Sequence, residues 1–138
     1  LADFAIALSP LQEMGRVARA GYIETPSPIA ELCRGVDGGS QPWRGYCHHR
    51  YFCWVEAGVL TFMAKYPILE YMDFGPLENQ LVRWLDESPR YWNTSFFWEG
   101  ELKYRLIEHG KDVDLLGDYP RKVAEAVEAS RIHIQEGL

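Results

Sequence analysis

The chain lacks several features that mark specialised classes of protein. It has no uninterrupted apolar run of the roughly 20 residues that a membrane-spanning helix needs, so we expect no membrane contact. Its three cysteines, Cys33, Cys47 and Cys53, are an odd number, which argues against a closed disulfide framework and favours free thiols. It contains no repeat, low-complexity tract or linker, so residues 1–138 are expected to form one compact domain.

Basic charge is also scarce. The 138 residues carry 14 Lys and Arg against 20 Asp and Glu, which gives a formal net charge of −6. An acidic surface repels phosphate backbones, so nucleic acid is not an expected partner, whereas a basic protein is. The apolar segment from Leu1 to Leu8 lacks a basic stretch and a cleavage pattern, which predicts that it is no signal peptide and that the protein is cytoplasmic.

Aromatic residues are abundant: five Trp, eight Tyr and six Phe make up 14% of the chain. They bury the largest area per residue and dominate cores and interfaces. Many fall in the longest apolar run, residues 46–66, which ends before Pro67. Its length favours a helix over a strand, and apolar side chains on every side predict a buried helix at the centre of the fold.

Start and stop signals predict further helices around this central one. They cover residues 9–21, 27–35, 76–87, about 95–109 and 118–137, with a short helical turn at 68–74. The glycine-rich segment 35–45 is expected to be a loop, and only residues 113–116 could be a strand. The sequence therefore predicts an all-α fold, a single compact domain of about six helices.

Potential metal ligands gather in the predicted central helix. On a helix, His49, Cys53 and Glu56 stand at i, i+4 and i+7 and share one face. With a fourth ligand such as His109 or His133, they could bind zinc or iron, and the chain would be a small helical metalloprotein or enzyme. No established metal-binding spacing is present, and free Cys often acts as a small buried apolar residue, so we expect no cofactor.

The same predicted helix contains the two residues that a thiolate nucleophile requires at least, a Cys and a His base, because His49 stands one turn from Cys53. An apolar environment raises the pKa of a thiol, however, and the middle of an apolar helix is such an environment. We therefore favour a structural role for Cys53.

A run of aromatic and charged residues follows a helix-ending proline. Arg90, Tyr91 and Trp92 belong to the residue types most enriched in binding hot spots, and the acidic Asp86 and Glu87 precede them. The two rings could instead anchor the loop to the core. We expect this acidic, aromatic face to bind another protein, which we expect to be basic.

In its small size, acidic charge, Trp content and predicted helical character, the chain resembles bacterial toxin-neutralising immunity proteins as a class. The resemblance rests on composition, covers no motif and transfers no residue. It implies a non-enzymatic protein-binding module that acts as an inhibitor of a partner protein.

Overall fold

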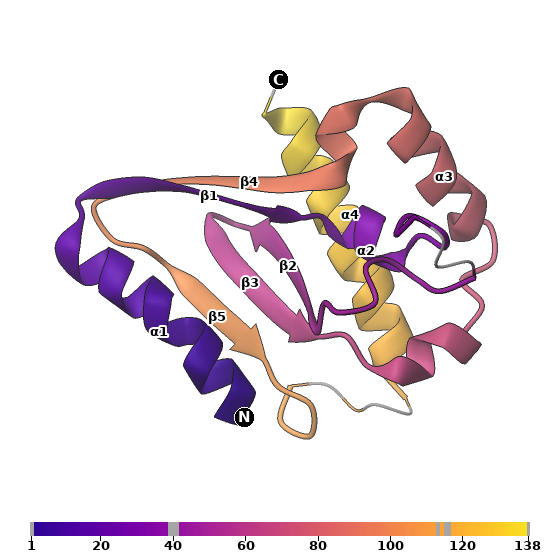
Figure 1. Ribbon diagram of the computed structural model, residues 1–138, viewed down its shortest axis with the longest axis horizontal. Helices are drawn as coiled ribbons and strands as arrows, with labels where there is room; N and C mark the ends of the chain where they lie inside the picture. The colour runs from indigo at the N-terminus through magenta and orange to yellow at the C-terminus, as the bar shows by residue number, and fades with distance from the viewer. Residues whose placement is uncertain (1, 39–41, 113, 115–116, 138) are drawn as a thin grey trace.

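The computed structural model describes residues 2–38, 42–112, 114 and 117–137, and its fold is mixed α/β (Figure 1). The all-α prediction is therefore wrong. The elements in chain order are α1 (Ala2–Val17), β1 (Ala20–Pro26), α2 (Pro28–Leu32), β2 (Tyr51–Glu56), β3 (Val59–Ala64), the 3-10 helix η1 (Pro67–Tyr71), α3 (Leu77–Glu87), the 3-10 helix η2 (Pro89–Trp92), β4 (Asn93–Glu99), β5 (Tyr104–Ile107) and α4 (Tyr119–Glu136).

The strands form two separate sheets. β1 and β4 pair antiparallel as a two-stranded ribbon, which we call the β1–β4 ribbon. β2 and β3 form an antiparallel hairpin, and β5 adds to β3 in parallel. Figure 1 shows the ribbon running above the three-stranded sheet, with α1 near β5 and α4 crossing by β2, against which it packs.

The three-stranded sheet is buried on both faces. One face packs against α2, α3 and α4 through side chains that include Phe52, Trp54 and Ile107. The other packs against α1 and the ribbon through a second cluster, to which Cys53, Val55, Leu60, Phe96, Trp98 and Leu102 belong. Alternate residues of β2 thus enter two different cores, which is why its four middle residues are all buried.

The predicted central helix at 46–66 is a β-hairpin. The strands meet at the pair Glu56↔Val59, and the two turn residues, Ala57 and Gly58, have φ values of 50° and 76°. Two positive φ values in a two-residue loop match the twist of adjoining strands. The apolar run is unbroken because the sheet is buried on both faces, a pattern that buried strands share with buried helices. The segment does lie in the core, where Phe52 is fully buried, but its conformation was mispredicted.

The predicted helix at 95–109 is also wrong, because β4 and β5 occupy most of this segment. Burial in β4 alternates: Phe96 and Trp98 are buried and Phe97 is exposed. The helix expected at 9–21 is displaced as well, since α1 ends at Val17. Gly21 lies in β1, where an added Cβ would stand 2.6 Å from the Trp98 indole nitrogen, so the residue allows a close approach.

Three predicted helices are present, as α2, α3 and α4. The Ser27 hydroxyl accepts a hydrogen bond from Ala30 N at 3.1 Å and caps α2. The candidate strand at 113–116 lies largely outside the described residues. All three cysteines are free thiols, as predicted, and none of the described helices has the length and apolar content to cross a bilayer.

Candidate functional site

The structure divides the predicted binding face at 86–92 into surface charges and core anchors. Asp86 and Glu87 are exposed, and Arg90 is half-buried with its guanidinium 5.2 Å from the centre of the Tyr91 ring. Tyr91 is 2% exposed, and Trp92 packs against the core while its Nε1 donates a hydrogen bond to a backbone carbonyl of α3 at 3.0 Å. The two rings therefore attach η2 to the core, and the charged residues remain available at the surface.

The predicted metal stripe is not assembled, because its residues lie before and within a strand instead of on a helix. Cys53 and Glu56 are three residues apart in β2 and point to opposite faces. Glu56 forms an ion pair with Arg105 at 3.0 Å. Among the side chains that the structure describes, no group of three or more His, Cys, Asp or Glu is placed to hold a metal ion.

The thiol alternative meets a similar obstacle. Burial raises the pKa of Cys53 to about 11, so its thiol carries almost no thiolate at neutral pH.

The two histidines considered as a fourth metal ligand have other contacts. His109 packs edge-on against the Tyr66 ring, with the ring centroids 5.9 Å apart. His133 donates from Nε2 to the carbonyl oxygen of Ser95 at 2.8 Å.

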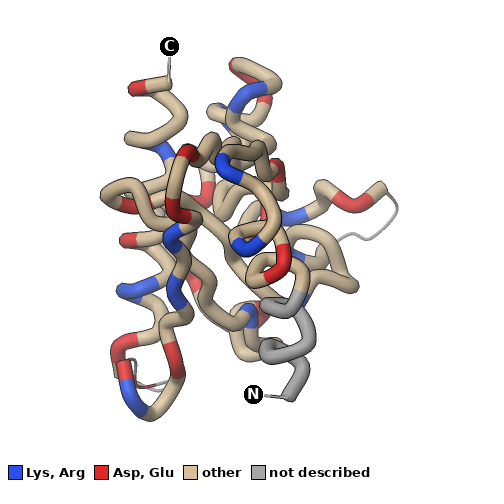
Figure 2. Tube along the Cα trace, turned by 90° about the vertical axis from the view of Figure 1, so that its left-hand side faces the viewer, with Lys and Arg blue, Asp and Glu red and all other residues tan. Residues whose placement is uncertain are grey.

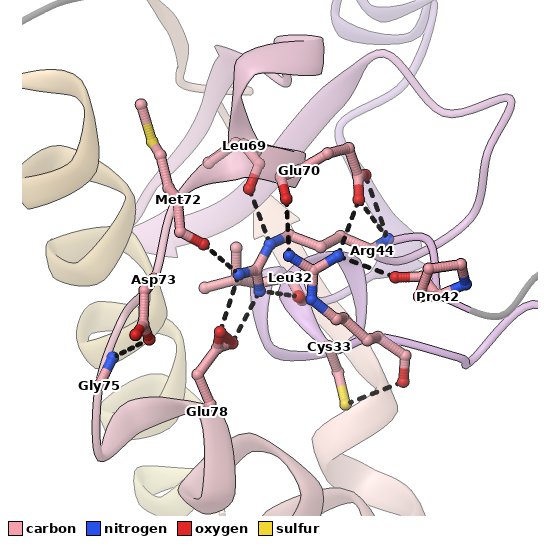
Figure 3. A network of polar contacts seen from close by, with 11 residues as sticks. Leu32, Cys33, Pro42, Arg44, Leu69, Glu70, Met72, Asp73, Gly75 and Glu78 are labelled. Atoms are coloured by element: carbon pink, nitrogen blue, oxygen red, sulfur yellow. Dashed lines mark hydrogen bonds and ion pairs between the residues drawn. The ribbon is translucent and has the colours of Figure 1, made fainter.

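A fully buried arginine organises the polar contacts beside α2 (Figure 3). The Arg44 side chain is 0% exposed, and its carboxylate partner Glu78 lies 2.8 Å away on α3 in a two-pronged contact. Three backbone carbonyls complete its contacts, those of Leu32, Leu69 and Met72, at 3.0, 2.9 and 2.7 Å. All five N–H groups of the guanidinium are thus bonded, so this arginine joins α2, η1 and α3.

Arg34 extends this network toward the surface. Its guanidinium donates to the Glu70 carboxylate at 3.0 Å and to the Pro42 carbonyl at 2.8 Å, as Figure 3 also shows. The backbone of Arg34 also forms an isolated bridge with that of Arg44, which brings the two ends of the intervening loop together. Because every charge here has an opposite partner, the network fits a structural role better than a binding role.

A second buried charge lies close to a half-exposed histidine. The Glu31 carboxylate on α2 is 1% exposed, and His49 Nδ1 lies 2.6 Å from it. Lys65 Nζ lies 3.2 Å from the other carboxylate oxygen, which also accepts a hydrogen bond from Tyr46 N at 3.1 Å. Of the residues in the predicted metal stripe, His49 is the one that the structure places in a buried polar cluster. The other members of this cluster, Glu31 and Lys65, were not identified from the sequence.

The outer edge of β4 carries no neighbouring strand in the part of the chain that the structure describes. Two hydrogen bonds fix the pattern of the ribbon: Ser27 N donates to Trp92 O at 2.9 Å, and Gly100 N donates to Arg19 O at 2.6 Å. Bonded and non-bonded pairs alternate in an antiparallel ladder, so the even-numbered residues of β4 bond to β1. The N–H and C=O groups of the odd-numbered residues, Phe97 among them, point toward the outer edge.

One face of the ribbon is exposed and aromatic. Phe97 is 78% exposed and Tyr22 45%, their ring centroids are 4.5 Å apart, and the Tyr22 hydroxyl bonds to Ser95 Oγ at 3.1 Å. Glu24 and Glu99 are exposed on the same face, and neither forms an ion pair with a described residue. This surface, which we call the ribbon face, places two rings between two carboxylates.

A groove of about 460 Å³ follows the outer edge of β4. Phe97 and Ser95 form its wall on the strand side, and His133 and Ile134 of α4 form the opposite wall. Arg90 lies at the same groove, so one residue of the predicted binding face borders the ribbon. Figure 2 shows that Lys and Arg are interspersed with Asp and Glu along the trace.

Comparison of the chain with protein-family models, with curated proteins and with solved structures finds no match. The functional interpretation therefore rests on the geometry described above.

Proposed function

We propose that the protein is a non-enzymatic binding module that takes an extended, basic segment of another protein along the outer edge of β4. The observation that carries this proposal is Phe97, a large apolar side chain that is 78% exposed on a strand edge with no neighbouring strand in the described structure. Adding a strand to such an edge is a common way to bind an extended peptide, because backbone hydrogen bonds supply affinity and alternate side chains supply specificity.

The ribbon face defines the chemistry of the partner. An apolar partner side chain would cover Phe97 and Tyr22, and Lys or Arg on either side of it would meet Glu24 and Glu99. The net charge of −6 would speed the encounter with such a segment, and this effect should weaken as salt rises. An inhibitor works in this manner when the bound segment belongs to the functional surface of its target, so an immunity-type role is one form of this proposal.

The residues at 86–92, which the sequence predicted as the binding face, divide into surface and supporting residues in this proposal. Arg90 borders the groove, and Asp86 and Glu87 add exposed negative charge from α3. Tyr91 and Trp92 support the surface from within, since both pack into the core and neither would touch a partner first.

The test uses a library of random peptides displayed on phage and selected against the intact protein. We expect the selected peptides to share an apolar residue flanked by Lys or Arg. Phe97→Ala should weaken their binding by about 30-fold, the equivalent of ~2 kcal/mol for a central hot-spot residue. The same change should cost less than ~1 kcal/mol of folding stability, because only an exposed cross-strand pair with Tyr22 is lost.

Tyr71 provides the matched control, since it is 90% exposed but lies on η1 and away from β4. Tyr71→Ala should leave peptide binding unchanged. Hydrogen exchange supplies a second readout, because a bound strand should protect the amide of Phe97, whose N–H points to the outer edge. Equal loss of binding in both variants, or binding without protection of that amide, would contradict the proposal.

A further inference from the structure

A cavity of about 310 Å³ lies between α1, β1 and the three-stranded sheet. We call it the α1 cavity. Its apolar walls include Leu11 of α1, Pro26 of β1, Tyr51 of β2 and Phe62 of β3. Its polar lining comes from Thr25, Glu31 and the segment 48–50, which includes His49. This volume is at the lower end of small-molecule sites, which combine apolar walls with placed polar groups.

The polar corner of the cavity is a histidine whose ring orientation is fixed. Glu31 is nearly fully buried, and its two carboxylate oxygens lie 2.6 Å from His49 Nδ1 and 3.2 Å from Lys65 Nζ. Because a carboxylate oxygen accepts hydrogen bonds, the neutral tautomer that fits this contact carries its proton on Nδ1. In that tautomer Nε2 has a lone pair on the far side of the ring from Glu31, and the side chain is 44% exposed.

A second polar group at the cavity has no satisfying partner. The Thr25 hydroxyl oxygen is buried and makes no standard hydrogen bond in the described structure, with only the weakly polar Cys53 thiol beside it. Both residues line the α1 cavity. A buried hydroxyl without a partner is uncommon, and a ligand that supplies one satisfies it.

We propose that the α1 cavity binds a small molecule of the phenol class, a single substituted aromatic ring with one acidic hydroxyl. The ring would pack against Tyr51 and Phe62, and its hydroxyl would donate to His49 Nε2. If the proton transfers, the O–H bond breaks, an N–H bond forms at Nε2, and the resulting imidazolium remains bonded to Glu31. The Thr25 hydroxyl, on the β1 side of the same cavity, would supply a second polar contact to the ligand.

This site is independent of the proposed protein-binding function. Thr25 comes from β1, but alternation along the strand places its side chain on the face opposite to Tyr22 and Glu24. A ligand in the α1 cavity therefore does not occupy the ribbon face. Phe97→Ala should leave the cavity unaffected, so failure of one proposal is distinguishable from failure of the other.

The test titrates the intact protein with 4-nitrophenol, whose phenolate absorbs visible light, and with 4-nitrotoluene, in which a methyl group replaces the hydroxyl. We expect 4-nitrophenol to bind about tenfold more tightly, the contribution of one good hydrogen bond, with a rise in phenolate absorbance. His49→Phe should remove both the preference and the absorbance change. Thr25→Val should weaken 4-nitrophenol several-fold and leave 4-nitrotoluene unchanged.

Two further variants identify the cavity, because His49 also borders a neighbouring cavity that Trp43 lines. Leu11→Trp should fill the α1 cavity and abolish binding of both probes, whereas Trp43→Ala should have no effect. Equal affinity for the two probes would overturn the proposal, as would loss of binding in Trp43→Ala but not in Leu11→Trp. If His49→Phe fails to fold, the Thr25→Val comparison alone decides the outcome.

Discussion

Replacing Arg44 by Met should destabilise the protein by about 3–5 kcal/mol, the range for breaking a buried ion pair by removing one partner. The structure supplies the reason in parts. Three buried backbone carbonyls, those of Leu32, Leu69 and Met72, would lose their donor, at about 1 kcal/mol each. Glu78 would lose a two-pronged partner, but its side chain is 30% exposed, so water would replace part of that contact. Met restores most of the lost volume, so a cavity adds little.

Urea unfolding followed by tryptophan fluorescence measures this change directly. Arg34→Met is the matched control, because Arg34 is 36% exposed and its loss should cost only about 1 kcal/mol. Arg44→Lys should fall between the two, since an ammonium keeps the charge but cannot reach all five acceptors. If Arg44→Met loses no more stability than Arg34→Met, the argument that Arg44 holds α2, η1 and α3 together is refuted.

Three other predictions follow from the same geometry. Gly45→Ala should lower the free energy of unfolding, measured in urea, by more than about 3 kcal/mol, because φ is +61° and the new Cβ would stand 2.3 Å from a backbone oxygen of α2. Gly58→Ala is the control: φ is +76° but the Cβ would meet no atom within 4 Å, so the change should cost only about 1 kcal/mol. Hydrogen bonds from Arg44 hold the pKa of Glu78 below its usual value, so the pair stabilises the fold above the ordinary carboxyl pKa and this contribution is lost as pH falls below about 5. Stability measured against pH should therefore fall less steeply on the acid side in Glu78→Gln than in the wild type, and parallel curves would contradict this. Trp92→Ala should lower stability by about 3 kcal/mol, because the ring packs against the core and its Nε1 bonds to α3; a loss below about 1 kcal/mol would return Trp92 to the candidate binding surface.

Two of the correctly predicted helices begin where local start signals stand. Ser27 followed by Pro28 opens α2, and Pro120 stands in the first turn of α4. Such signals act within one turn of the chain, but they do not decide alone: the signal that predicted a helix start at residue 9 failed, because α1 begins at Ala2 and contains Pro10. α3 likewise has a polar face and an apolar face with Leu81 and Leu85 buried, a period that the sequence displays directly.

The strands were missed because their burial hides their period. β2 sends Phe52 and Trp54 to one core and Cys53 and Val55 to another, so its apolar run never alternates with polar residues. Length then favoured a helix, since nothing obvious divided residues 46–66. The available signal was the pair Ala57-Gly58 between two segments rich in aromatic and β-branched residues, which is a hairpin pattern weaker than Asn-Gly.

The polar site was only partly predictable for a different reason. His49 was a candidate from the sequence, but its partners lie far away along the chain: Glu31 is 18 residues from His49, and Lys65 is 34 residues from Glu31. No periodicity connects residues at such separations, because tertiary packing brings them together. The same holds for Arg44, whose carboxylate partner is 34 residues away.

The outer edge of β4 also explains why a partner is a better interpretation of the ribbon face than an unspecialised surface. Proteins protect free strand edges with Lys, Pro, a bulge or a covering element, because an open edge invites pairing with other chains. On β4 the protection is incomplete: His133 engages the Ser95 carbonyl, but Phe97 stands beyond it with its backbone groups directed outward. Such protection normally removes a large apolar side chain from an open edge, and Phe97, at 78% exposed, buries little area in the fold. Its position is accounted for when a strand from a partner completes the edge and covers the ring.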